Sequence, residues 1–263
     1  MTTDNVVVAT TAEDAHAVDA IKNHHAEIAG RIAILTNALL DAAESNQGAD
    51  AARRAAAGYL TGTLLPHAIA EEQTLYPAAA RRPEAKALVE SMIAVHRVLA
   101  TLVDRVERET SPTRAAAAGY ALRILLDAHL VDENDRILPL VAADPDVSLA
   151  GIVAGMHDLL GAHGEAGADG AGADGACGGH SCTCGEQDEP DPVLDVRDIP
   201  HAIRHATVFG AFDAVPIGGT LVLVAPHDPL PLLRQLADRA GGRLGVDYEE
   251  RGPEAWRLRL TRV

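Results

Sequence analysis

Two stretches of the sequence decide the fold: LLPHAIAEEQTLYPA (residues 64–78) and LDAHLVDENDRILPL (residues 126–140). Each holds a histidine followed four residues later by a glutamate, His67 with Glu71 and His129 with Glu133. Residues four apart in an α-helix lie on one face, one turn from each other. Each stretch therefore presents an imidazole and a carboxylate side by side, and two such helices facing each other have the donors to hold two metal ions.

The surrounding chain has the periodicity of long helices. Apolar residues recur at intervals of three and four over residues 12–44, 49–80, 84–109 and 112–143, which predicts four helices with one buried face each. Pro66 interrupts the second and is expected to kink it, and Ser111 is expected to cap the fourth. A short fifth helix is predicted in SLAGIVAGMHDLLG (residues 148–161). Short connections between helices of similar length predict an up-down-up-down four-helix bundle.

The histidines of this predicted bundle fall at one depth. One lies near the middle of each long helix: His25, His67, His96 and His129. A single histidine in a helix is more often a core or surface residue than a ligand, but mid-helix residues of a bundle share one layer. With the two glutamates they form a nitrogen and oxygen donor set that suits iron or manganese. Buried carboxylates are costly when unpaired, and coordination removes that cost.

Neighbouring polar residues leave alternatives open. Of the adjacent His24 and His25, we expect His25 to point inward, because it lies on the apolar stripe three residues before Ile28. Glu72 is expected near the ligands or facing solvent, with the alternative that it moves in as an extra ligand. We expect the same outer position for Asp132 and Asp135.

The pattern of one histidine, HxxxE, one histidine and HxxxE resembles the hemerythrin-type (HHE) cation-binding domain over about residues 12–163. This resemblance implies a di-iron centre whose ligands are His25, His67, Glu71, His96, His129 and Glu133. Oxygen-carrying hemerythrins have a second histidine where this chain has Met92, and an aspartate five residues after the fourth-helix histidine instead of Glu133. Both departures look more like bacterial proteins of the iron-centre-repair type and related sensing or NO-handling domains.

Composition and charge exclude several other classes. A chain of 263 residues with 48% hydrophobic residues is long enough for two globular domains. The formal net charge of −16 leaves no basic face for nucleic acid. No apolar run approaches the roughly 18 to 20 residues of a membrane helix, and the N-terminus lacks a basic segment before an apolar stretch. We therefore expect a cytoplasmic protein with no nucleic-acid or membrane partner.

Residues 164–191 are rich in glycine and acidic residues and are predicted to form a flexible linker that only tethers the two domains. Cys177, Cys182 and Cys184 lie here together with His180. These residues could bind a soft metal, or Cys182 and Cys184 could form a redox pair. The alternative is that they belong to an exposed, oxidisable linker. Their spacing matches no structural zinc pattern.

Residues 192–263 have a different texture, which predicts a small two-layer domain of order β-α-β-α-β-β. The stretch LDVRDIPHAIRHATVFGAFDAVPIGGTLVLVAPHDPLPLL (residues 194–233) resembles an uncharacterised family often fused to hemerythrin-type domains, with a fold similar to the TusA/SirA-like sulfur carriers. Pro200 and His201 stand where sulfur carriers have Cys-Pro, so sulfur transfer by that cysteine is not available. The domain also carries four polar residues that either form a second site for a small ligand or a metal, or are ordinary surface residues: Arg204, His205, His227 and Asp228.

Three functional hypotheses follow. The first is a non-haem di-iron protein that binds O2, NO or peroxide for sensing, for defence against nitric oxide or oxidative stress, or for iron-centre repair. The second is an iron-responsive regulatory module without turnover, which acts on a protein partner through the C-terminal domain. The third is a catalytic role such as peroxide decomposition, for which the sequence offers no acid or base beyond the ligands.

Overall fold

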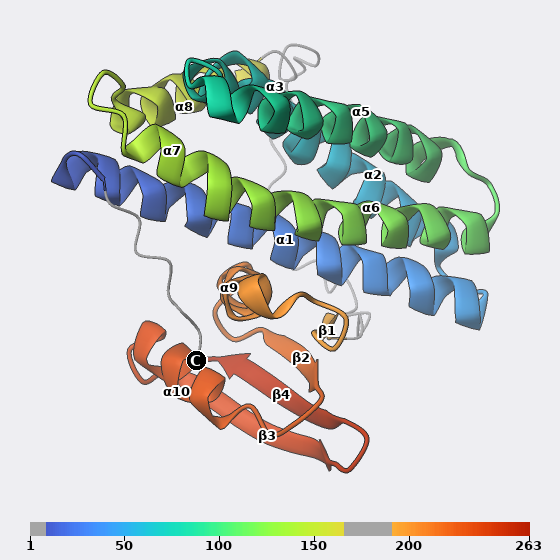
Figure 1. The fold of residues 1–263 in the computed structure, drawn as a ribbon. Coiled ribbons are helices and arrows are strands. Elements are labelled where there is room, and N and C mark those ends of the chain that lie inside the picture. Colours follow the sequence, from blue (N-terminus) through green and yellow to red (C-terminus); the bar gives the residue numbers. More distant parts are fainter. Residues whose placement is uncertain (1–8, 166–190) are drawn as a thin grey trace, which may run out of the picture.

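The computed structural model describes residues 9–165 and 191–263. The first range forms a helical bundle and the second a small sheet with two helices, as Figure 1 shows. The helices of the bundle are α1 (Ala12–Ser45), α2 (Ala49–Tyr59), α3 (Leu65–Gln73), α4 (Leu75–Ala79), α5 (Lys86–Arg108), α6 (Pro112–Asp132), α7 (Leu138–Ala142) and α8 (Leu149–Glu165). Around the bundle, α1 and α5 each lie between α2 and α6. The predicted fold class is confirmed.

Two of the predicted long helices are interrupted by π-helical turns. The turn η1 (Leu60–Leu64) joins α2 to α3 and precedes Pro66, and η3 (Glu133–Ile137) joins α6 to α7 and precedes Pro139. Proline has no N–H for the helical ladder, and its ring clashes with the carbonyl four residues earlier. The wider turn accommodates that carbonyl, so each rod continues through its proline. The π turns flank the histidine–glutamate pairs, and Glu133 is itself the first residue of η3.

The helix expected over residues 49–80 also breaks at Thr74, which the sequence analysis did not predict. Thr74 has φ −125° and ψ −68°, outside the helical region, and the chain resumes as α4 at Leu75. The break has the same cause, because Pro77 cannot donate to the carbonyl of Gln73 and would clash with it. The break sets the direction of Tyr76.

The capping role predicted for Ser111 was wrong. Ser111 does occupy the residue before α6, and Pro112 is the first helical residue, but the serine hydroxyl makes no capping hydrogen bond. Glu109 Oε1 accepts the N–H groups of Thr110 at 3.1 Å and Ser111 at 3.2 Å, both of which precede the helix. This carboxylate therefore fixes the connection before α6 but does not cap the helix.

Helix α8, which corresponds to the short fifth helix predicted from the sequence, is fixed to α1 by the buried carboxylate of Asp14. Asp14 accepts the N–H of Ala150 at 3.1 Å and the hydroxyls of Thr10 and Thr11 at 3.0 and 2.8 Å. These bonds, the one from Ala150 first, hold the pKa of Asp14 below its usual value. The stability that Asp14 contributes is therefore present above its ordinary pKa and is lost as the pH falls through the lowered value.

Replacing Asp14 by alanine is expected to lower the free energy of unfolding by about 1–3 kcal/mol at neutral pH, because three donors lose the charged acceptor that joins α8 to α1. Urea denaturation at pH 7 and again below about pH 4 measures the effect, and the difference from the wild type should shrink in acid. Asp19→Ala, an exposed position on the same helix, is the matched control and should change little. Equal effects of the two substitutions would contradict the role of Asp14.

The C-terminal range has the predicted order β-α-β-α-β-β. Its elements are β1 (Val193–Asp195), α9 (His201–Asp213), β2 (Thr220–Ala225), α10 (Leu230–Arg239), β3 (Leu244–Arg251) and β4 (Trp256–Arg262). The sheet order is β1-β2-β4-β3, with β1 parallel to β2 and the other pairs antiparallel. Strand β3 begins four residues before the expected YEERG, because Leu244 to Asp247 pair with the end of β4.

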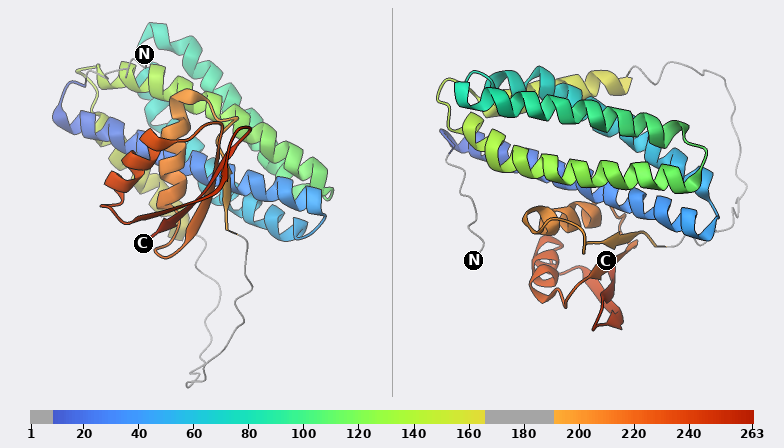
Figure 2. Two further views of the ribbon diagram at one scale, coloured as in Figure 1. Left: turned by 90° about the horizontal axis from the view of Figure 1, so that it is seen from below. Right: turned by 45° about the vertical axis from the view of Figure 1, so that its right-hand side comes forward.

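The C-terminal domain packs directly on the bundle, so the prediction that the two parts are only tethered was wrong. Figures 1 and 2 show α9 next to α1, between the bundle and the sheet. Ala33 and Ile34 of α1 belong to the same apolar cluster as Val208 and Phe212 of α9. Residues 166–190, with Cys177, Cys182 and Cys184, lie outside the described residues.

No helix among the described residues combines the length and the apolar character needed to cross a membrane.

Candidate metal centre

The bundle brings the predicted ligands into one buried cluster. They come from different rods: His25 from α1, His67 and Glu71 from α3, His96 from α5, His129 from α6 and Glu133 from η3. All are buried, with between 0% and 6% of each residue exposed. The four-residue spacing has this effect because both members of each pair lie on the inward face of their rod.

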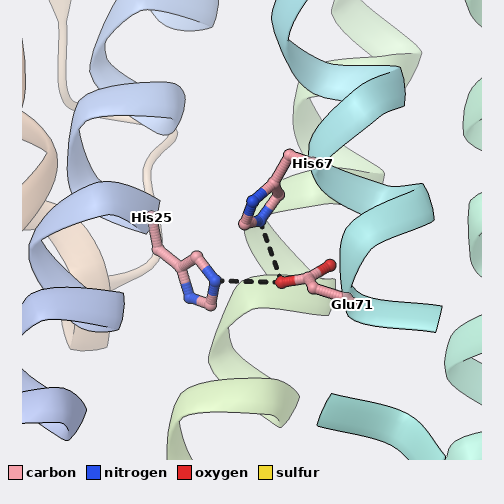
Figure 3. A group of neighbouring side chains, drawn as sticks. All are labelled: His25, His67 and Glu71. Atoms are coloured by element: carbon pink, nitrogen blue, oxygen red, sulfur yellow. Dashed lines mark hydrogen bonds and ion pairs between the residues drawn. The ribbon is translucent and has the colours of Figure 1, made fainter. Parts of the chain in front are cut away.

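Glu71 lies at the middle of the cluster. Its Oε1 is 3.1 Å from His25 Nε2 and 2.9 Å from His67 Nε2, the arrangement drawn in Figure 3. Its Oε2 faces the other way and is 3.5 Å from His96 Nε2. The two oxygens of one carboxylate thus serve two groups of side chains, each compact enough to hold an ion: His25, His67 and Glu71, and Glu71, His96 and His129.

Glu133 also lies between the two groups. Its Oε2 is 3.7 Å from His25 Nε2 and 3.7 Å from His129 Nε2. Neither of its oxygens makes a hydrogen bond within the described part of the chain. A fully buried carboxylate without hydrogen bonds is unfavourable. Cations placed between the two histidine groups would satisfy both oxygens.

The hydrogen positions on the histidines point the same way. The side-chain oxygen of Asn134 lies 2.9 Å from His25 Nδ1, and Glu72 Oε1 lies 2.9 Å from His96 Nδ1. Both oxygens are acceptors, so in the neutral imidazoles Nδ1 carries the hydrogen and Nε2 presents a lone pair. The Nε2 lone pairs of His25 and His96 then face Glu71 Oε1 at 3.1 Å and His129 Nε2 at 3.1 Å. Such pairs of acceptors repel unless a proton or a metal cation lies between them, so the cluster is a place for positive charge and fits a metal centre.

The electrostatics of the cluster differ between its two carboxylates. Burial would raise the pKa of Glu71, but His67 and His25 outweigh it and hold that pKa well below its usual range. Burial, followed by the negative charge of Glu71, raises the pKa of Glu133 well above its usual range. Burial also lowers the pKa of His129 to about 3. His129 is therefore a neutral imidazole, and a cation beside Glu133 would return its carboxyl group to the ionised form that binds metal.

Comparison with known families agrees with this geometry. The family model described as hemerythrin HHE cation binding domain matches residues 16–169, more than half of the chain. The chain belongs to the hemerythrin HHE cation-binding family. Domains of this family bind metal cations, typically iron, and the resemblance stated from the sequence is confirmed.

A second family model, an uncharacterized conserved protein family (DUF2249), matches residues 193–262. The likeness of this domain to TusA/SirA-like carriers stays a prediction. No curated protein and no solved structure matches the chain.

The sequence analysis of the hemerythrin-type domain missed Asn134. It follows Glu133 directly in HLVDEN, and the only signal of its role is an amide next to a ligand on a buried helix. By accepting from His25 Nδ1 it fixes the ring orientation and the tautomer that leaves Nε2 free. Glu72 does the same for His96 Nδ1. It therefore has the predicted place next to a candidate ligand. Outer partners of this kind orient ligands and raise their basicity.

Replacing Asn134 by alanine is expected to weaken metal binding about 10- to 100-fold, because His25 loses the acceptor that orients it. Competition for metal against a chelator of known affinity measures the effect. Asn134→Asp keeps an acceptor at the same place and should retain affinity. If Asn134→Asp loses as much affinity as Asn134→Ala, the orienting role is wrong.

Tyr76 is a second residue of the hemerythrin-type domain that the sequence analysis missed. Its hydroxyl lies 3.2 Å from His96 Nε2 and 3.3 Å from His129 Nε2, and the side chain is buried. Burial, with further contributions from Glu133 and Glu71, raises the pKa of Tyr76, so the phenol keeps its proton. Tyr76 lies in α4, just after the break at Thr74, and Pro77 is the sequence signal that could have predicted that break. The two histidine groups are therefore not equivalent, because the phenol accompanies His96 and His129.

The structure also separates the remaining candidates. His25 is the buried member of the adjacent pair, while the side chain of His24 is 39% exposed. Asp132 pairs with Arg136 at 3.3 Å, and Asp135 is exposed. These two carboxylates face outward, away from the cluster, as expected.

The polar set of the C-terminal domain forms no comparable cluster. Arg204 donates twice to the carbonyl of Ile199, and Asp228 accepts the hydroxyl of Tyr248 at 2.9 Å. His205 and His227 are exposed. In residues 9–165 and 191–263, the groups of three or more side chains close enough to hold an ion are those of the bundle. The alternative of a second metal site at this set therefore has no support among the described residues.

Proposed function

We propose that the chain is a non-haem di-iron protein. His25 and His67 hold one iron, His96 and His129 hold the other, and Glu71 and Glu133 bridge them. The observation that carries this assignment is the position of Glu71, whose two oxygens face the two histidine groups from opposite sides. Nitrogen and oxygen donors without thiolate favour iron, with manganese as the less suitable alternative.

The ligand count leaves room for a small molecule. Two imidazoles and two shared carboxylates give each ion four donors from the protein, fewer than iron commonly binds. A di-iron pair held by these residues would supply reversible binding of O2, NO or peroxide, or their reduction with electrons from the ferrous ions. Met92 is buried one turn before His96 and offers no imidazole to fill the remaining position. The Tyr76 hydroxyl holds a proton beside His96 and His129, where it can donate to a bound small molecule.

We propose that this chemistry serves sensing, defence against NO or oxidative stress, or iron-centre repair. The test is to reduce the iron-loaded protein anaerobically and to add NO, O2 and hydrogen peroxide in separate experiments, following the absorption spectrum. A reversible change with one gas supports a sensor or carrier. Consumption of several equivalents of NO or peroxide per protein supports a reductase or a peroxide-decomposing enzyme. No spectral change with any of the three would contradict the proposal.

One observation favours the second candidate, an iron-responsive module without turnover. The C-terminal domain packs on α1, the helix that carries His25. A metal-dependent shift of α1 would therefore reach the surface of the C-terminal domain and a protein partner bound there. This candidate predicts that iron loading alters hydrogen exchange in α9 while the protein shows no turnover of NO or peroxide. Turnover, or unchanged exchange in α9, would count against it.

A further inference from the structure

A close backbone contact between the two domains lies next to the proposed metal ligand His25. Gly210 of α9 faces the backbone of α1 so closely that a Cβ atom there would lie 2.3 Å from the carbonyl oxygen of Ala26 and 2.6 Å from the N of Glu27. Ala26 and Glu27 immediately follow His25. From the other side, a Cβ atom on Gly30 would lie 2.4 Å from the N of Ala211. The backbones of α1 and α9 therefore touch at one turn of α1, the turn that bears His25.

Other contacts join the same two domains at α6. Asp198 accepts the hydroxyl of Tyr120 at 3.2 Å and lies 3.9 Å from the guanidinium of Arg123. Val131, between His129 and Glu133 in the sequence, packs against the apolar cluster of the C-terminal domain. The C-terminal domain thus bears on the two ligand helices, α1 and α6, that lie on its side of the bundle.

The ligands differ in how their own elements fix them. His67 and Glu71 share one helix, so their spacing is set by local backbone geometry. His25 lies on a different helix, α1, from Glu71. Its distance to Glu71 therefore depends on how α1 is rotated and shifted in the bundle. Asn37, also on α1, donates to the carbonyl of Val193 at 2.8 Å and adds a second fixed point along the helix. Metal sites tolerate errors of only about 0.2 Å in ligand distance.

We propose that the C-terminal domain is a positioning element of the metal centre: docked through Gly210, it holds α1 so that His25 meets Glu71 and His67. The inference rests on the proposed di-iron centre and deepens it, since it names how that centre is regulated. Because the backbone contact lies on α1, undocking weakens the iron position of His25, His67 and Glu71 more than the position of His96 and His129. By linkage, a partner that pulls the C-terminal domain away releases one iron, and iron at that position opposes the partner.

The test variant is Gly210→Leu, which lies in the C-terminal domain and removes no ligand or ligand neighbour. Its side chain would collide with the backbone of α1, where nothing flexible can give way. The matched control is Gly58→Leu on α2, where an added Cβ atom has nothing within 4 Å. The full-length apoprotein is titrated anaerobically with ferrous iron alone against a competing chelator. Small-angle X-ray scattering reports whether the domains are docked, and circular dichroism reports folding.

For wild type and Gly58→Leu we expect two tight equivalents of iron and a docked molecule. For Gly210→Leu we expect an expanded molecule in which one equivalent is weakened about tenfold or more while the other changes clearly less. Two unchanged equivalents in the expanded variant would overturn the proposal. Equal weakening of both equivalents, with lower thermal stability, would also overturn it, because it would show a general structural effect.

A second variant covers a misfolded or still docked Gly210→Leu. The double substitution Asn37→Ala with Asp198→Ala removes the flanking polar contacts without adding an atom to the contact with α1. It is held to the same expectations and the same contradicting results. If the wild type binds fewer than two equivalents of iron, the proposed di-iron centre itself is wrong. If it binds two equivalents whose affinities do not change on undocking, only the positioning role of the C-terminal domain is wrong.

Discussion

Glu71→Ala is expected to abolish iron binding at both positions, the largest effect of any single substitution in the bundle. Glu71 is common to both ligand groups, with Oε1 toward His25 and His67 and Oε2 toward His96. Removing the bridge takes one donor from each ion and leaves the histidine pairs without a shared negative charge. Iron per chain, measured by elemental analysis after anaerobic reconstitution and desalting, should fall from two to less than one.

Glu72→Gln is the matched control for this substitution. Glu72 is the adjacent residue, but its side chain is 36% exposed and contacts His96 through Nδ1, on the far side of the ring. The amide of glutamine keeps an acceptor for that bond, so both irons should be retained. Retention of two irons by Glu71→Ala, or loss of both by Glu72→Gln, would show that the bridging carboxylate has been assigned to the wrong residue.

Metal removal is expected to reveal Glu133 as a residue whose effect on stability changes with iron. In the metal-free protein its carboxyl is buried, makes no hydrogen bond among the described residues and has a raised pKa. Glu133→Gln should therefore leave the free energy of unfolding of the metal-free protein unchanged or slightly higher. With iron, the wild type gains about 4 kcal/mol for each site at a free-iron concentration a thousand times the Kd. The variant should lose most of that gain.

Chemical denaturation with excess ferrous iron and, separately, with a chelator measures both states under anaerobic conditions. Glu90→Gln, at an exposed position on α5, controls for the loss of a negative charge and should keep the full iron-dependent gain. A Glu133→Gln variant that is strongly destabilised without metal would contradict this interpretation. It would mean that the carboxylate is held by a structural partner, so its burial would not indicate a ligand.

The candidate ligands could be recognised in the sequence because their chemistry and their spacing coincide. His67 and Glu71, like His129 and Glu133, are charged or polar residues on an apolar stripe, and the four-residue period is a local property of helices. The order of the C-terminal elements was also predictable, because the alternation of apolar and polar residues changes there from helical to strand period. Both features can be read without knowing which segments meet.

The remaining features depend on contacts that no local pattern encodes. Tyr76 points to His96 and His129 only because Pro77 breaks the helix at Thr74. Asn134 matters because the turn η3 presents it to a histidine more than a hundred residues earlier in the chain. Gly30 and Gly210 are unremarkable glycines in their own helices. Their pairing is visible only once α9 lies on α1, and the acidic segment between the domains predicted independence instead.

The central claim is that the bundle holds two irons, and it is tested most directly by elemental analysis with the absorption spectrum before and after dithionite. We predict two irons per chain and an ultraviolet–visible absorption of the oxidised protein that bleaches on reduction. The absence of iron, or a single zinc ion that is lost when Cys177, Cys182 and Cys184 are replaced, would contradict the claim. Either result would mean that the buried layer of histidines is not a di-iron centre.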